Sequence, residues 1–399
     1  MPRTSPLSST VLTLCLAEGL TLIGVFAFPA LMPDFKALWR LTNAQAGWIA
    51  GVYFLGYALA VPVLTSLTDR IDAKRVFIAG IALCALASAG FAWMASGLWT
   101  AMAFRALGGV GLAGVYMPGL KALIDRSPAG EGQARSISFY TASFSLGTML
   151  SFMVIGEAAL RLGWQGAFLL SAACALAGLA LALRLKPVPP PPCAAAGGGL
   201  LDFRPVLANR AAMGYILGYV CHMWELFTFR AWTVAFLAFA QAHAGGGGWA
   251  PTSVATVCSL AAMAASLGGA DLAIRFDRRK VCAVAMFLSG GMALVVGLTA
   301  ALPYWAAAVA AVVYNGLVQI DSAALTTGAM MAAAVSRRGS TAALHSLLGF
   351  SAAFFGPLAQ GSILDRVGSG TVAGWTIAFA AMGGVGLLGP LALAWSRPR

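Results

Sequence analysis

The carboxylate and imidazole side chains that could exchange protons lie inside long apolar stretches of this sequence. Glu18 stands about halfway along an apolar run near residues 8–31, and His222 and Glu225 about halfway along another near 211–239. A spacing of three places His222 and Glu225 on one helical face, where they can share a proton or a hydrogen bond. This group predicts a proton-coupling site, and the alternative is a polar pair that holds one helix against its neighbour.

Two arginines occur in similar apolar surroundings. Arg105 keeps its charge and presents a planar fork of donors that suits carboxylate and phosphate groups, so we expect it to bind an anionic substrate or to pair with Glu18. A structural role is the alternative. Arg230 lies eight residues after His222, and its alternative is a side chain that extends along its helix toward water.

A further carboxylate, Asp321, lies within a dense polar stripe. This stripe must face a protein interior, and Asp321 could take up a proton there, although hydrogen bonding between helices explains most of the stripe without a substrate. Its members are Asn315, Gln319, Asp321, Ser322, Thr326 and Thr327.

The composition shows what must position these side chains. Of the 399 residues, 60% are hydrophobic and 10% charged, whereas soluble domains are nearer half apolar and a quarter charged. Since a helix needs roughly 20 apolar residues to cross a bilayer, the chain has room for about twelve spans. The bilayer is therefore an expected partner, and charged groups within it ask for a counter-charge or a water-filled cavity.

Apolar runs between charged or Gly/Pro-rich breaks predict two sets of six spans, separated by a Pro- and Gly-rich segment. This divides the chain into an N-terminal half (1–183), a linker (184–210) and a C-terminal half (211–399). The predicted spans lie near 8–31, 44–67, 76–96, 98–123, 136–157, 164–183, 211–239, 250–273, 281–300, 303–331, 341–363 and 371–395.

The net charge of +12 lies mainly in the loops on one side of these spans, which argues against nucleic acid as a partner. Four of the 25 Lys and Arg residues fall on the opposite side and three within spans, which leaves eighteen on the first side. The positive-inside rule then predicts a multi-pass protein of the bacterial inner membrane with both termini in the cytoplasm. The opposite-side residues are Lys36, Arg40, Arg161 and Arg366, and those within spans are Arg105, Lys121 and Arg230.

The two halves align at an offset of 205 residues. DRIDAKRV (69–76) matches IRFDRRKV (274–281), and the same offset places Gly156 on Gly361. Halves of matching topology predict a parallel repeat with a substrate site near the midplane between them.

Three segments resemble motifs of the major facilitator superfamily. TSLTDRIDAKR (65–75) is similar to motif A, GxLaDrxGrkr, although Thr65 and Asp72 replace its glycines. RALGGVGLAG (105–114) resembles motif B, whose buried arginine would be Arg105, and GWQGAF (163–168) resembles the start of span 6. The antiporter pattern gxxxGPxxGG is missing from span 5, and the nitrate signature is absent.

This resemblance implies an all-α membrane fold of about twelve helices in two pseudo-symmetric six-helix bundles. It also implies a cytoplasmic gate, in which charged loop residues form ion pairs between the halves in one conformation. The alternative is that these charges only set orientation. The candidate gate residues are Asp69, Arg70, Arg75, Arg275, Asp277 and Arg279.

Other kinds of chemistry find little support in the sequence. The seven cysteines are scattered without CxxC spacing, and the three histidines lie far apart without an HExxH pattern. Without a P-loop, ATP-driven pumping is also disfavoured. We therefore expect no enzyme activity, cofactor or metal.

The sequence thus predicts a monomeric secondary transporter that moves a small organic anion, coupled to protons, by alternating access. One alternative is a proton antiporter that exports drugs or lipophilic cations, with Glu18 and Glu225 binding the positive charge. A membrane sensor that moves no solute is an alternative from another functional class.

Overall fold

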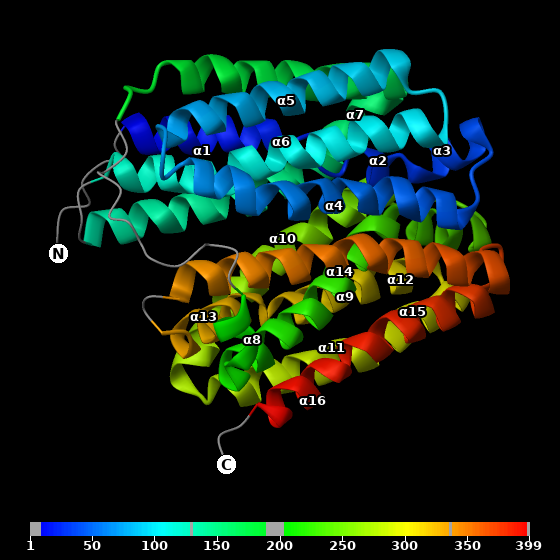
Figure 1. The fold of residues 1–399 in the computed structure, drawn as a ribbon. Helices are drawn as coiled ribbons and strands as arrows, with labels where there is room; N and C mark the ends of the chain where they lie inside the picture. The colour runs from blue at the N-terminus through cyan, green and yellow to red at the C-terminus, as the bar shows by residue number, and fades with distance from the viewer. Residues whose placement is uncertain (1–8, 128–130, 189–202, 335–336, 397–399) are drawn as a thin grey trace, which may run out of the picture.

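The computed structural model describes residues 9–127, 131–188, 203–334 and 337–396, and every regular element in these ranges is a helix. The helices form two bundles that lie side by side (Figure 1), which confirms the predicted all-α fold. The N-bundle contains α1 (Ser9–Leu22), α2 (Ala27–Ala30), α3 (Met32–Trp39), α4 (Asn43–Leu67), α5 (Ala73–Met94), α6 (Leu98–Asp125) and α7 (Glu131–Leu183). The C-bundle contains α8 (Arg204–Ala208), α9 (Arg210–His243), α10 (Pro251–Arg275), α11 (Arg278–Leu298), η1 (Thr299–Ala301), α12 (Tyr304–Gln319), α13 (Ser322–Ala332), α14 (Arg338–Val367), α15 (Val372–Gly386) and α16 (Leu388–Trp395).

The connections divide between two ends of the bundles. α1 begins and α16 ends at one end, which we call the terminal end and which lies on the left of Figure 1. The connections before α5 and α11 lie there as well. The opposite end, called the far end, carries the connections before α4 and α15.

Nine helices in the described part of the chain are long and apolar enough to cross a membrane. One of them, Arg135–Leu183, holds two predicted spans, because Gly163 interrupts α7 with φ +71° and ψ 175°. Glycine adopts this conformation without a Cβ clash. The predicted spans near 8–31 and 211–239 correspond to α1–α2 and to α9.

Three predicted spans are divided between two consecutive α-helices, among them the twelfth, which consists of α15 and α16 on either side of Leu387. The first is interrupted between α1 and α2, where Pro29 lacks the N–H that would bond the carbonyl of Val25. The tenth is interrupted at Ile320 and Asp321, between α12 and α13. Hydropathy alone predicted one uninterrupted helix in each case, because a break does not change the apolar content of a run.

The internal repeat is visible in local structure. Asp72 caps α5 by accepting a hydrogen bond from the Lys74 N–H at 2.9 Å. Asp277 caps α11 in the same way, by accepting a hydrogen bond from the Lys280 N–H at 2.8 Å. Aspartate is favoured at this position because its carboxylate satisfies free N–H groups at the helix N-terminus. The two aligned aspartates therefore cap equivalent helices in the two halves.

The bundles meet along α4 and α14, which run side by side (Figure 1). Their backbones approach closely where α4 has Gly47 and Gly51: a Cβ at these positions would collide with the carbonyl oxygens of Pro357 and Phe354. Small residues permit such close contact between membrane helices. The Trp232 indole N–H also donates to the Pro357 carbonyl at 3.0 Å.

At the far end this contact includes a polar cluster, which we call the clasp. The carboxylate of Asp365 on α14 accepts hydrogen bonds of 2.8 Å from the backbone N–H groups of Asn43 and Ala44 and from the Asn43 side chain. Asn43 also donates to Ser369 at 3.2 Å and accepts from Lys36. A carboxylate of one bundle thus binds the N-terminus of a helix in the other, where free N–H groups favour negative charge.

Candidate functional site

Arg105 holds the break in the first span. It lies on α6 with 3% of its surface exposed and donates to the carbonyls of Val25 at 2.9 Å and Gly24 at 3.3 Å. The Val25 carbonyl is the one that Pro29 cannot bond, so the guanidinium replaces the missing backbone donor. The Tyr53 ring lies 4.1 Å from the guanidinium carbon.

Arg230 approaches the same break from the C-bundle. Its guanidinium carbon lies 5.7 Å from the ring centre of Phe26 and 5.6 Å from that of Phe227. These rings belong to different bundles and stack 6.4 Å apart, so Arg230 lies at their seam. Its Nε atom is buried without a hydrogen-bond partner.

Glu18 is fully buried on α1. One carboxylate oxygen accepts a 2.5 Å hydrogen bond from the Ser143 hydroxyl of α7, and the other has no partner. The predicted pair between Glu18 and Arg105 is absent in this conformation, because Arg105 is engaged by the carbonyls of the span break.

His222 pairs with Asp321 across two elements of the C-bundle. His222 Nδ1 lies 2.7 Å from Asp321 Oδ1, and the two side chains are 1% and 3% exposed. Asp321 lies at the junction of α12 and α13, and His222 lies on α9. The ring of Tyr219 is centred 5.8 Å from that of His222 and 3.8 Å from that of His345.

Glu225 has a different set of partners. Its carboxylate accepts hydrogen bonds from the Tyr314 hydroxyl at 2.8 Å and from the Ser289 hydroxyl at 3.1 Å. The expectation that His222 and Glu225 share a hydrogen bond is therefore wrong for this conformation. Each finds a partner on another helix instead.

Several residues around these groups escaped the sequence analysis. Ser143, Ser289 and Tyr314 each bind a buried carboxylate, and His345 bonds to Thr326 at 3.3 Å. The three hydroxyl groups come from helices remote in sequence from the carboxylates they bind. A rule that pairs every buried carboxylate with a hydroxyl on another helix would find the type of partner but not its position.

The residues of the predicted polar stripe do not all face the protein interior. Asn315 is buried and donates to the Cys258 carbonyl at 2.8 Å, whereas Thr326 and Thr327 are exposed. The described residues contain no group of three or more His, Cys, Asp or Glu side chains that could hold a metal ion.

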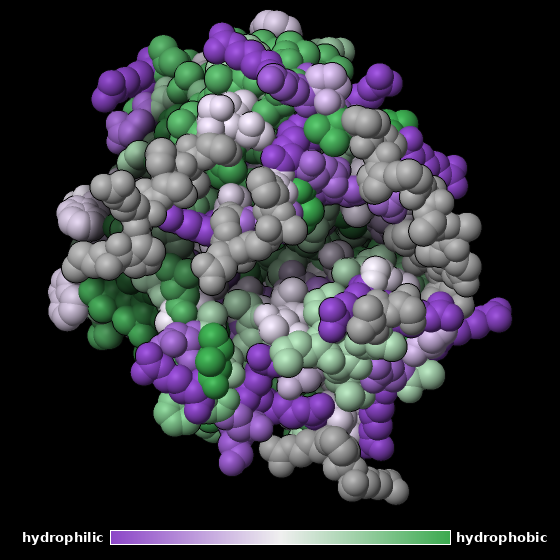
Figure 2. Space-filling view, turned by 90° about the vertical axis from the view of Figure 1, so that its left-hand side faces the viewer, coloured by the Kyte–Doolittle hydropathy of each residue, from purple (hydrophilic) through white to green (hydrophobic). Residues whose placement is uncertain are grey.

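The candidate gate residues make contacts within their own bundles. Arg275 pairs with Asp271 at 2.8 Å, and Arg279 donates to Ser396 at 2.8 Å. No ion pair joins the two bundles through Asp69, Arg70 or Arg75 in the described ranges. The terminal-end surface is hollowed, with hydrophilic residues gathered around the hollow (Figure 2).

Asp72 has a second role besides its helix cap. Arg126 donates to its carboxylate at 2.9 Å, and the Val188 N–H donates at 2.9 Å. Burial raises the pKa of the Asp72 carboxyl, but these hydrogen bonds outweigh burial and hold the pKa below its ordinary value. The ionised form therefore ties α5 to α6 and to the segment after α7.

Two side-by-side helical bundles with charged groups buried near interrupted spans are typical of secondary transporters built from two repeats. The chain belongs to the major facilitator superfamily, whose family model matches residues 14–253, about three fifths of its length. The protein is accordingly a multi-pass membrane protein of a family of transporters.

Related proteins include several kinds of carrier. The chain is 31% identical over 147 residues to the niacin transporter NiaP of Acinetobacter baylyi, a match covering 37% of this chain and 33% of that protein. It is 25% identical over 258 residues to spinster homolog 3 of Danio rerio, covering 61% and 52%. The matched part thus spans about a third to a half of these relatives. A bacterial homolog of the human lysosomal transporter Spinster, crystallised inward-facing and occupied, superposes with a TM-score of 0.74 at 16% identity, covering 98% and 97%.

Proposed function

We propose that the protein is a proton-coupled secondary carrier that moves a small organic anion across a bacterial inner membrane by alternating access. One observation carries the proposal: Arg105 and Arg230, one from each bundle, converge on the break in the first span without a carboxylate partner among the described residues. A buried cation is costly unless it is paired. An anion bound at the seam would supply the missing counter-charge.

The partners of the two guanidinium groups leave donors available. An arginine has five N–H donors, and Arg105 directs two of its nitrogens to backbone carbonyls while its Nε remains buried and unpaired. The guanidinium of Arg230 lies against the rings of Phe26 and Phe227, and no ion pair with it is found among the described residues. Planar donor forks suit a carboxylate, and the neighbouring Phe26 and Phe227 suit an aromatic body.

One relative, from Acinetobacter baylyi, is named as a niacin transporter, and the name of another, from Bacillus subtilis, gives niacin and nicotinamide together. Niacin is an aromatic carboxylate, so it agrees with both features of the seam. It is therefore the first substrate to test on this chain.

We assign proton coupling to the His222–Asp321 pair. His222 and Asp321 lie 2.7 Å apart, close enough for a proton to pass between imidazole and carboxylate, and their contact joins α9 to the junction of α12 and α13. Glu225 already has two hydroxyl donors, so its role is to hold α9 against α11 and α12.

The conformation agrees with a carrier open at the terminal end. The clasp joins the two bundles at the far end, whereas within the described residues no ion pair joins the gate residues of the terminal end across the bundles. With both termini in the cytoplasm, the hollow would face inward. The gate residues would then form their pairs when the protein opens outward.

Export of lipophilic cations is the second candidate. The unpaired oxygen of buried Glu18 favours it, because a cation would satisfy that carboxylate. Relatives named for methylenomycin A resistance and multidrug resistance agree with this alternative. Arg105 would then have only its structural role.

The test uses purified protein in liposomes with radiolabelled niacin or a lipophilic cation and an imposed pH gradient. We expect niacin accumulation, and Arg230→Gln should raise KM by about tenfold, the loss of one charge-assisted contact. Cation flux with no niacin flux would favour the second candidate. Absence of any flux, despite ligand binding, would identify a sensor.

Matched variants test the coupling assignment, since each removes one buried carboxylate from the C-bundle. We expect Asp321→Asn to keep substrate exchange but to lose accumulation driven by the pH gradient. Glu225→Gln should retain gradient-driven accumulation. The opposite pattern would move the coupling site to Glu225.

A further inference from the structure

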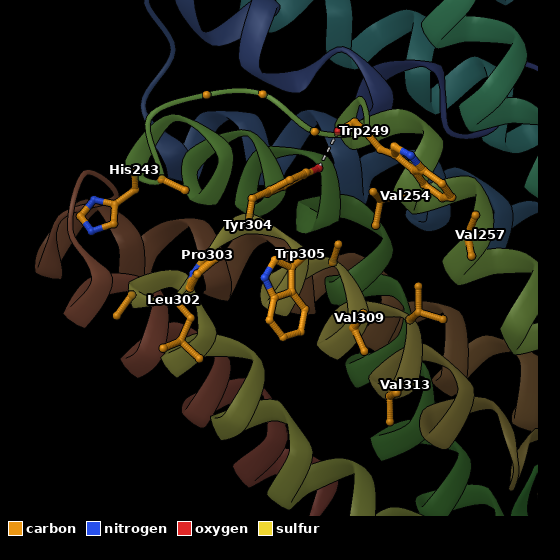
Figure 3. Close-up of a pocket in the computed structure, with 17 residues that line it drawn as sticks. His243, Trp249, Val254, Val257, Leu302, Pro303, Tyr304, Trp305, Val309 and Val313 are labelled. Atoms are coloured by element: carbon orange, nitrogen blue, oxygen red, sulfur yellow. Dashed lines mark hydrogen bonds between the residues drawn. The ribbon is translucent and has the colours of Figure 1, made fainter.

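A large groove lies on the outside of the C-bundle at the far end, away from both arginines. It has a volume of about 900 Å³ and runs between the end of α9, the connection to α10, and α12 (Figure 3). The side chains that face it are almost all apolar. Those used below are His243, Trp249, Tyr304, Trp305, Val309 and Val313.

Exposed tryptophans mark the level of the groove in the membrane. Trp93 and Trp99 of the N-bundle are 75% and 78% exposed at the far end, and Trp249 and Trp305 of the C-bundle are 68% and 69% exposed. Tryptophan is enriched where the headgroups meet the hydrocarbon. The mouth of the groove therefore lies at the membrane interface.

The groove is polar at one end only. His243 and the backbone of the connection lie toward one end of the groove, and Val309 and Val313 lie toward the other (Figure 3). From Tyr304, where α12 begins, to Val313 the helix rises about 13 Å, at 1.5 Å per residue. The groove thus changes from polar near the membrane interface to apolar toward the hydrocarbon core, as a phospholipid does from its headgroup to its acyl chains.

The walls of the groove are braced. Tyr304 donates a hydrogen bond to the Trp249 carbonyl at 2.9 Å, and Gln241 donates to the carbonyls of Gly247 at 2.9 Å and Trp249 at 3.3 Å. These bonds tie the connection to α9 and α12. The space is therefore preformed, and an occupant does not have to order its walls first.

We propose that this groove is a binding site for one acyl chain of a bilayer phospholipid, with the headgroup at His243 and the connection before α10. Within a membrane, apolar chains are the molecules that surround an exposed helix face, and a preformed apolar space beside them loses contacts if it stays empty. The site lies outside the seam between the bundles. It is thus distinct from the proposed anion site and does not depend on it.

The experiment counts phospholipids that remain on the purified wild-type protein after mild delipidation, by native mass spectrometry. Val309→Trp fills the groove and should lose one bound phospholipid relative to wild type. Leu267→Trp is the matched control, because Leu267 is 71% exposed on α10 and does not line the groove. It should retain the wild-type number.

Ala308→Phe provides a second, smaller filling variant if Val309→Trp does not fold. Equal lipid numbers in wild type and either folded variant would overturn the proposal. A wild-type dimer that Val309→Trp dissociates would also overturn it, because a second copy of the chain would then occupy the groove.

Discussion

Replacing Asp365 with alanine should weaken closure of the far end. The carboxylate accepts three hydrogen bonds of 2.8 Å from Asn43 and Ala44, and it faces the N-terminus of α4 across the seam between the bundles. These contacts exist only while α14 lies against α4. Their loss should therefore shift the conformational equilibrium with little effect on the folding of either bundle.

The magnitude follows from the exposure of the carboxylate. Because Asp365 is exposed, we count each hydrogen bond at the lower end of the usual range, about 0.5 kcal/mol. The charge at the helix N-terminus adds about 0.5 kcal/mol. The total of about 2 kcal/mol corresponds to roughly a 30-fold shift, which would raise a far-end-open fraction from about 1% to about 25%.

The assay measures the distance between spin labels at Leu38 and Gly370 on a cysteine-depleted background. Both positions are exposed at the far end, one in each bundle. Glu157→Ala is the control, since its exposed carboxylate pairs only with Arg161 of the same helix. Identical distance distributions for Asp365→Ala and wild type would show that the clasp does not hold the far end closed.

Two further predictions concern the terminal end. Asp72→Asn should lower stability by about 1 kcal/mol at pH 7, because ionised Asp72 binds Arg126 and the Val188 N–H. Since the pKa of Asp72 is lowered in the folded protein, its stabilisation is present above the unfolded pKa of about 3.9 and is lost as pH falls further. Thermal melts at pH 7 and pH 3 should show the difference shrink, and a constant difference would contradict the assignment. Arg70→Ala and Arg275→Ala should slow transport about five- to tenfold with normal membrane insertion, through a shifted equilibrium between conformations; wild-type rates in both would leave these charges a role in orientation alone.

The helical fold could be predicted from the sequence because membrane spans are specified by their apolar content. The repeat was also readable, since Asp72 and Asp277 are local signals that cap the helices following them. The breaks were not readable from hydropathy. Pro29 gave a possible signal, but its effect depends on Arg105, 76 positions later, which supplies the donor that stabilises the break.

The pairing of buried charges was the least predictable feature. A spacing of three residues places His222 and Glu225 on one helical face, but it does not decide whether their partners lie on the same helix. Asp321 reaches His222 because α12 ends before it, and Tyr314 reaches Glu225 from the same span. Such choices depend on how helices rotate against one another, which an apolar run leaves unspecified.

If an anion binds Arg105 as proposed, the hydrogen bonds from Arg105 to the first span would make anion affinity and helix shape thermodynamically reciprocal. A substrate that turns the guanidinium toward itself withdraws a donor from the Val25 carbonyl, which Pro29 has left without its backbone partner. The cost of that orphaned carbonyl then opposes tight binding in the bent form of the span. A rearrangement that gives the Val25 carbonyl another donor would raise the affinity for the anion by the same free energy. The bend of the first span would then influence how readily the proposed substrate dissociates.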